Sequence, residues 1–465
     1  MTNNKSALQA DHSLNNLLYF IRISALGLLL LTLFVESKVG SSHYHVLDIL
    51  FMLKGGWLNI PLLPGMSAAF ASFGWFPVFI EIFSIFALLL LFFKPASRLS
   101  YVLAISALLL RNVASHLTVG VHTASIFLVP LLLLALDPPR QENSGKVRQR
   151  LIVAIALMYL FSAFFKLNQT FLSGTIVEKS FLYRLSLKSF LDWVAAFKVT
   201  VLLGPALEFF AFFMIFRRTR KFALACALLF HFVVSIWIFL SVGLAIFGCS
   251  ILLLFNQEQD LKLYYRRLVF VSGTFTALLY GLNYQVLGNF QHFQASVYDA
   301  VSIGMAALAM FWAFSLLVKF NIEPINYVSK WGSFLPVAYV TLSFTLSWPE
   351  PFGYTQYAGL PAPSYVTVLS LHEVRKHPQV YSFARRWRTR SLRFYESNEF
   401  VAIFPTQAMT QNFIQYYAQL EPRCEYKSYV SPAGGNFENL VYDYAVRRQA
   451  FDSLPLQSCS LSPPE

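Results

Sequence analysis

Apolar stretches close to bilayer length recur along the chain and limit what it can fold into. A helix needs about 20 apolar residues to cross the hydrocarbon core of a membrane. Charged residues make up 13% of the 465 residues, against about 25% in an ordinary soluble domain. We therefore predict an all-α polytopic membrane protein of about eleven spans. The expected spans lie near residues 17–35, 69–93, 99–118, 121–137, 151–167, 199–216, 222–241, 243–256, 267–284, 298–318 and 331–348.

Basic residues in the short loops predict the orientation of these spans. Lysine and arginine collect in cytoplasmic loops, and clusters of them follow the second, fourth, sixth and eighth stretches. The run from Phe222 to Phe255 is long for one span and short for two, so we predict a tight helical hairpin that turns near Gly243. This pattern gives a cytoplasmic N-terminus and an extracytoplasmic C-terminus, and it places Lys166 on the outer side.

The net charge of +13 is explained by these basic loops. The bilayer is the expected partner, and nucleic acid is not expected. The first sixteen residues are polar and lack a small-residue cleavage site, which predicts a retained first helix instead of a signal peptide.

The chain divides into three parts by composition. Residues 1–257 form the first transmembrane unit, and 258–348 supply further transmembrane helices. Residues 349–465 begin with a proline-rich linker and continue as a small extracytoplasmic α+β domain, with a hairpin from Ser391–Glu396 to Phe400–Phe404 and a helix from Met409 to Leu420. Cys424 and Cys459 could pair in an oxidising compartment, or remain as two free thiols.

Four ionisable residues are expected inside the membrane, where such groups are costly and often functional. They are Glu81, Arg111, Glu208 and His231. An ion pair of Arg111 with Glu81 or Glu208 would fix helix register and need no chemistry. His231 could be a satisfied core residue, a proton carrier or a ligand to a polar head group.

Lys166 ends the apolar helix expected in the stretch from Tyr159 to Gly174. Partial burial of a lysine favours the neutral amine, which makes Lys166 a candidate base. Lysines at helix ends also serve as interfacial anchors, and that alternative stays open. No histidine or cysteine spacing is typical of a metal site, so no metal is expected.

These residues resemble a known family. Tyr159, Lys166-Leu167 and Gly174, then Glu208, the basic cluster 217–221, and Phe230-His231 leading into Gly243, are similar in order to the HTTM (horizontally transferred transmembrane) domain. Vitamin K-dependent gamma-glutamyl carboxylase shares that domain. The resemblance covers roughly residues 15–257. It implies a multi-pass protein of a bacterial inner membrane.

The resemblance also implies a chemistry. In the carboxylase, a lysine at the position of Lys166 deprotonates a reduced quinone, vitamin K hydroquinone, on the lumenal side. Oxygen then yields a stronger base that removes a glutamate γ-proton, and the carbanion takes up carbon dioxide. Here Lys166 and His231 would be catalytic, and the expected cofactor contacts are Arg111, His116, His122 and Glu208.

The sequence also departs from the carboxylase. Phe165 stands where the carboxylase has a second lysine, and Phe171 replaces an expected tryptophan. Two functions remain in view. One is a quinol-dependent enzyme that modifies a secreted peptide or small molecule at the outer face. The other is a non-catalytic membrane protein for maturation, export or tolerance of a secreted peptide. A transporter is a third alternative, but no inverted repeat is found.

Overall fold

A computed structural model of the chain describes eleven segments. They are residues 2–34, 76–115, 122–167, 199–237, 242–255, 259–285, 291–319, 364–377, 399–404, 407–431 and 454–459. Helix predominates in them, with twelve α-helices and one small sheet. The mostly helical prediction is therefore confirmed for the described residues. The eleventh expected span, the linker and His116 lie outside them.

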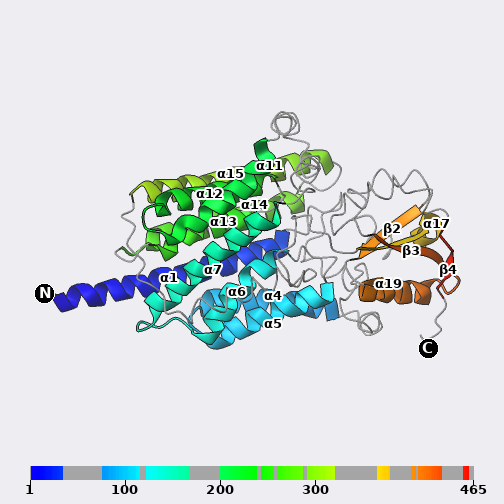
Figure 1. The fold of residues 1–465 in the computed structure, drawn as a ribbon, viewed down its shortest axis with the longest axis horizontal. Helices are drawn as coiled ribbons and strands as arrows, with labels where there is room; N and C mark the ends of the chain where they lie inside the picture. Colours follow the sequence, from blue (N-terminus) through cyan, green and yellow to red (C-terminus); the bar gives the residue numbers. More distant parts are fainter. Residues whose placement is uncertain are drawn as a thin grey trace.

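Ten of the described α-helices, with two short 3-10 segments, make up the helical part (Figure 1). Each of the first ten expected apolar stretches overlaps one or more of these elements. The α-helices are α1 (Thr2–Phe34), α4 (Phe76–Phe93), α5 (Arg98–Ser115), α6 (His122–Leu136), α7 (Ser144–Phe165), α11 (Val199–Phe212), α12 (Arg220–Trp237), α13 (Val242–Ser250), α14 (Lys262–Gln285) and α15 (Gln291–Lys319). The 3-10 segments are η3 (Phe213–Ile215) and η4 (Ile251–Leu254).

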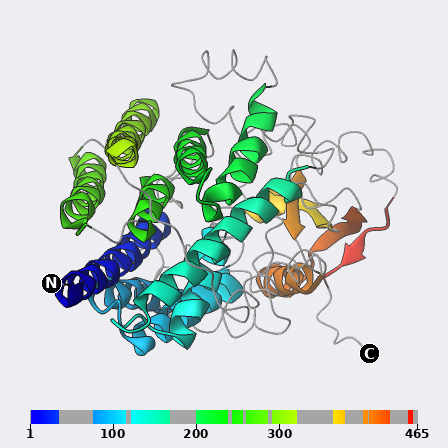
Figure 2. The ribbon, with the colours of Figure 1, turned by 60° about the vertical axis from the view of Figure 1, so that its left-hand side comes forward.

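The helices pack around two neighbouring groups. One is formed by α7, α11 and α12, since α11 contacts both of the others, and the second surrounds α1, which contacts α4, α13 and α14 (Figures 1 and 2). Buried leucine, alanine and phenylalanine side chains from these helices form one hydrophobic core. The buried Asn16 ties α1 to the start of α14, because its side chain bonds the Gln259 carbonyl and the Leu261 N–H.

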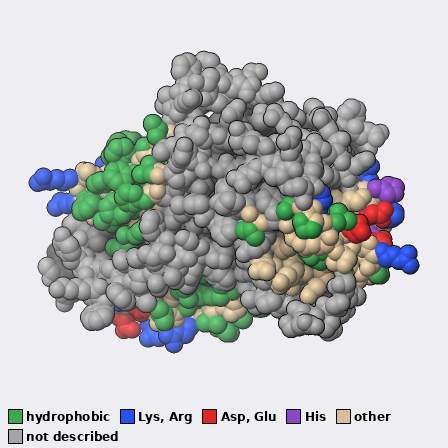
Figure 3. All heavy atoms as spheres, turned by 45° about the vertical axis from the view of Figure 1, so that its right-hand side comes forward, with side chains coloured by type: hydrophobic (Ala, Val, Ile, Leu, Met, Phe, Trp, Pro, Cys, Tyr) green, Lys and Arg blue, Asp and Glu red, His purple; other side chains and the backbone are tan. Residues whose placement is uncertain are grey.

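Two stretches of helix are long and apolar enough to cross a membrane by length and composition. They are His12–Leu30 in α1 and Ser144–Phe164 in α7. Large apolar side chains are also exposed along other helices, among them Phe86, Phe270 and Phe311. Figure 3 shows hydrophobic side chains gathered on the described helical surface, with lysine and arginine side chains at its margin.

The run from 222 to 256 forms two helices that pack on each other, as a hairpin requires. Helix α12 ends at Trp237 and α13 begins at Val242. Gly243 is the second residue of α13, and the connection at residues 238–241 lies outside the described part of the chain.

The C-terminal segments form a small α+β unit at one end of the helical part (Figure 1). Its strands are β1 (Ser364–Ser370), β2 (Glu399–Phe404), β3 (Glu425–Ser431) and β4 (Gln457–Ser458), in the order β2-β1-β3-β4. All neighbouring strands are antiparallel. Its helices are α17 (Leu371–Arg375) and α19 (Gln407–Leu420).

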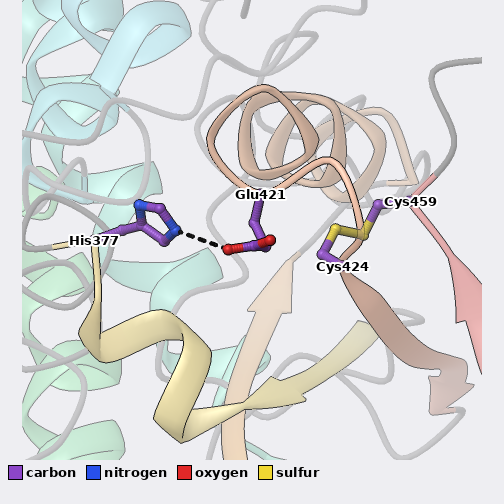
Figure 4. The surroundings of a disulfide bond; sticks show 4 residues. All are labelled: His377, Glu421, Cys424 and Cys459. Carbon is purple, nitrogen blue, oxygen red and sulfur yellow. Dashed lines mark ion pairs between the residues drawn. A yellow bond between two sulfur atoms is a disulfide. The ribbon is translucent and has the colours of Figure 1, made fainter.

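The predicted helix Met409–Leu420 is therefore found as α19, and an α+β character is confirmed for the described residues. Strand β2 covers the expected segment Phe400–Phe404, and it pairs with β1. Its expected hairpin partner, Ser391–Glu396, lies outside the described residues. Cys424 and Cys459 form a disulfide that joins the residue before β3 to the residue after β4 (Figure 4).

Candidate functional site

Helix α7 brings three polar side chains to one face. Tyr159, Ser162 and Lys166 follow one another at spacings of three and four residues, which places them on the same side of a helix. Lys166 caps the C-terminus of α7, and its backbone N–H bonds the carbonyl of Ala163. A lysine at this position is favoured by the negative end of the helix dipole.

Lys166 and Glu208 form the central ion pair of the site. The Lys166 ammonium Nζ lies 2.6 Å from Oε1 and 2.5 Å from Oε2 of Glu208 on α11. Only 2% of the Glu208 side chain and 12% of the Lys166 side chain are exposed. Removing two charges from water is costly, and it is tolerated only where the charges are paired and hydrogen-bonded.

Ser162 completes the bonding of this pair. Its hydroxyl donates to Glu208 Oε1 at 2.7 Å and accepts a bond from Lys166 Nζ at 2.9 Å. An ammonium has three N–H donors, and here three oxygens from two side chains surround it. The three groups form a closed triangle of charge-assisted hydrogen bonds.

An aromatic ring lies beside the ion pair. Lys166 Nζ lies 5.4 Å from the centre of the Phe230 ring, a cation–π distance. Phe164 and Phe209 pack edge to face across α7 and α11, with 6.4 Å between ring centres. Phe230 and the burial of both charged side chains place the ion pair in an apolar setting, where charges interact more strongly than in water.

A second polar pair lies two turns back along α7. The Tyr159 hydroxyl is 2.6 Å from Nε2 of His231 on α12, and both side chains are buried. The His231 ring packs against Phe230 and Phe247. Phe247 lies on α13, and a Cβ atom added at its neighbour Gly248 would lie 2.6 Å from the imidazole carbons Cγ and Cδ2.

The structure thus gathers three of the residues that the sequence marks out. Lys166 and Glu208 are in direct contact, while His231 reaches the same face of α7 through Tyr159. Arg111 and His122 lie on α5 and α6, but their side chains, like that of Glu81, lie outside what the structure describes. The lysine partner of Glu208 was not predicted, since the sequence suggested Arg111.

Two contributors were not identified in the sequence: Ser162 and Gly248. Ser162 lies four residues before Lys166 in an otherwise apolar run, and this spacing is the one signal that could have identified it. Phe230 entered the sequence analysis only as part of the family resemblance, and its contact with Lys166 was not predicted. Gly248 acts through close approach of two helices, which only the packing reveals.

The arrangement is suited to acid–base chemistry. An amine, a carboxylate and a hydroxyl in mutual contact can exchange protons with one another and with a bound acid. Within the described residues, no group of three or more His, Cys, Asp or Glu side chains could hold a metal ion.

Comparison of the chain with protein-family models, with curated proteins and with solved structures finds no match in any of the three. A function for the site therefore has to be argued from its own geometry and chemistry.

Proposed function

We propose that this chain is a multi-pass membrane enzyme in which Lys166 and Glu208 form an acid–base site. The observation that carries the proposal is the buried contact of the Lys166 ammonium with both oxygens of Glu208. Ionisable groups are rare in apolar helices, and those that occur mark functional sites by default. The resemblance to the HTTM domain assigns the same lysine a catalytic role.

Exposed apolar side chains support membrane embedding. Phe86, Phe270 and Phe311 are each more than half exposed, and each lies within an apolar helix. Such faces suit contact with lipid, and in water they would favour aggregation. The full proposal is about eleven spans, of which α1 and α7 have the clearest length and composition.

Charge distribution along α7 supports the orientation. The helix begins beside Lys146, Arg148 and Arg150 and ends at Lys166, 16 residues after the last of these (166 − 150). At 1.5 Å per residue this separation is about 24 Å along the axis. If this basic end of α7 lies on the cytoplasmic side, Lys166 lies towards the outer side. The Cys424–Cys459 disulfide agrees with an oxidising compartment for the C-terminal unit.

One aromatic contact of Lys166 supports a reduced quinone as the cofactor. Phe230 offers an aromatic face beside the amine, and Lys166 can accept a proton from a bound hydroxyl once it is uncharged. A reduced quinone would supply a weakly acidic hydroxyl and two reducing electrons for reaction with oxygen. Lys166 would bind its hydroxyl, Phe230 would orient its ring, and Glu208 would hold a proton.

Carboxylation provides the direct experimental test. Purified protein in lipid nanodiscs would be given a reduced quinone, oxygen, labelled carbon dioxide and a glutamate-containing peptide. We expect label in the peptide with wild type and none with Lys166→Ala, while Lys262→Ala, a change at an exposed lysine, serves as the matched control. Absence of label with wild type would exclude carboxylation and leave other proton-transfer reactions of reduced quinones to be tested.

The complete hydrogen bonding of the Lys166 ammonium also favours a second function. Because three acceptors already surround the Lys166 ammonium, the pair could serve only to lock α7 against α11. The protein would then act without catalysis in the maturation, export or tolerance of a secreted peptide, through its C-terminal unit. Under this alternative, Lys166→Met together with Glu208→Leu would preserve the function in cells, whereas the enzyme proposal predicts its loss.

A further inference from the structure

The hydrogen bonds of Lys166 indicate whether its side chain is an ammonium or a neutral amine in the resting site. A base needs a free lone pair, which only the neutral amine has. The three N–H donors of the ammonium form match the three oxygens found around Nζ, which are Glu208 Oε1, Glu208 Oε2 and Ser162 Oγ. A neutral amine has one donor fewer and would leave one of these contacts unmade.

We infer that the site is at rest as a closed ammonium–carboxylate pair, and that Glu208 is the proton acceptor through which Lys166 becomes a base. This inference rests on the proposed acid–base function and assigns its regulation to Glu208. In the resting site Lys166 is therefore not a base, because its ammonium must first lose a proton to Glu208. Glu208 is the described acceptor in contact with it that can take a full proton.

The proton balance takes three steps. The Lys166 ammonium gives one proton to the Glu208 carboxylate, which leaves a neutral amine and a neutral carboxylic acid. The amine lone pair next takes a proton from a bound weak acid, so that the ligand becomes an anion and Lys166 becomes an ammonium again. Glu208 then gives its proton to water and returns to the carboxylate.

The apolar surroundings favour the first step. An apolar setting raises the free energy of the ammonium–carboxylate pair more than that of the neutral amine and carboxylic acid. The free-energy difference between the two states is therefore smaller than it would be in water. The described titratable groups near the pair are Tyr159, which lies within reach of the Glu208 charge, and its partner His231. Ser162 keeps the amine and the carboxylate aligned while the proton moves, since it bonds both.

Amine labelling tests the resting state without any assay of catalysis. The full-length protein in nanodiscs would be treated with trace labelled acetic anhydride between pH 7 and 10, and modification at each lysine measured by mass spectrometry. Acetic anhydride reacts only with neutral amines, and the exposed Lys262 provides an internal reference. The variants are Glu208→Gln, Glu208→Asp, Ser162→Ala and the control Glu142→Gln, whose carboxylate is exposed.

Glu208→Gln should raise labelling of Lys166, relative to Lys262, by about tenfold or more at pH 8, because the opposite charge that favours the ammonium is gone. Glu208→Asp should keep labelling low, since it retains the charge, and Glu142→Gln should change nothing. Ser162→Ala removes one acceptor and should give a smaller increase. It also provides a second test if Glu208→Gln fails to fold.

Equal labelling of Lys166 in wild type, Glu208→Gln and Ser162→Ala would overturn the inference, because a closed ammonium pair would then not exist. The two proposals can fail separately. Suppose that Lys166 labelling is low in wild type and rises in Glu208→Gln, and that neither carboxylation nor quinone turnover is found. This result would support the closed pair and refute the enzyme proposal. Turnover lost in Lys166→Ala with unchanged labelling in Glu208→Gln would support the enzyme and refute the role of Glu208.

Discussion

Gly248 and His231 are in contact so close that no side chain fits between them. A Cβ atom built on Gly248 would lie 2.6 Å from both Cγ and Cδ2 of the imidazole ring. Helix α13 therefore lies directly against the ring and holds it towards Tyr159. The position of His231 depends on a glycine from another helix.

Gly248→Ala should destabilise the protein by about 1–3 kcal/mol, because an extra methyl group in a tightly packed interior forces side chains to move. Gly204→Ala is the matched control, since the space around Gly204 in α11 is open within 4 Å. That change should be neutral or should stabilise by up to about 1 kcal/mol. Thermal unfolding in detergent measures both, and equal midpoints for the two variants would contradict the packing described.

Tyr159→Phe removes the hydroxyl that His231 Nε2 contacts at 2.6 Å. The imidazole is 5% exposed, so loss of a buried hydrogen-bond partner should cost about 1–3 kcal/mol. A double-mutant cycle of Tyr159→Phe with His231→Leu measures the coupling energy of the two side chains. The control is the same cycle with Tyr19→Phe, on α1, in place of Tyr159→Phe. A coupling energy near zero would show that the two side chains do not act together.

Tyr417 should make the stability of the C-terminal unit sensitive to alkaline pH. Burial raises the pKa of Tyr417 to about 12, helped by the charges of Glu421 and Glu373. A tyrosine in the unfolded chain has a pKa of about 10, so above that pH the unfolded chain loses a proton that the folded chain keeps. The stabilisation from Tyr417 is therefore complete below about pH 10 and is lost as the pH rises towards about 12, on the order of 2 kcal/mol in all.

Tyr417→Phe should remove this part of the pH dependence. Within the described residues the Tyr417 hydroxyl has no hydrogen-bond partner, so the change should be neutral or slightly stabilising at pH 7. Urea unfolding followed at pH 7, 10 and 11.5 gives both results. A loss of stability at pH 7, or an unchanged alkaline slope, would contradict this assignment.

The Cys424–Cys459 disulfide should stabilise the C-terminal unit. The two cysteines are 35 residues apart, and a loop of that size corresponds to about 3–4 kcal/mol from restriction of the unfolded chain. Replacement of both cysteines by serine should lower stability by about that amount. The control is Cys226→Ser with Cys249→Ser, two free buried thiols, which should leave protease resistance of the C-terminal unit unchanged. Unchanged stability after replacement of Cys424 and Cys459 would show that the disulfide has no stabilising role.

The helical architecture could be predicted from the sequence because apolar runs of membrane length have few alternatives. The hairpin within 222–256 followed from flanking basic clusters, and α19 followed from local pattern. The pairing of β2 with β1 did not, because it joins strands far apart in the sequence. The strand β1, whose first residue precedes that of β2 by 35 positions (399 − 364), is the partner that the structure describes.

The candidate site residues stood out in the sequence more clearly than their contacts. Lys166, Glu208 and His231 stood out because charged or titratable groups are rare in apolar runs. Their pairing depends on the rotation of α11 and α12 about their axes, and no local signal in the sequence fixes that rotation. Gly248 acts through a neighbour on another helix, and Ser162 bonds Glu208 on α11 as well as Lys166 on its own helix, so their full set of contacts could not be assigned before those helices were placed.

Turnover of a reduced quinone by purified protein in nanodiscs tests the central claim most directly. Wild type, Lys166→Ala and the control Lys262→Ala would be compared at equal amounts of folded protein, with oxygen and peptide present. The acid–base site predicts that Lys166→Ala lowers the rate by about 100-fold or more and that Lys262→Ala matches wild type. Turnover by wild type that Lys166→Ala leaves intact would contradict it.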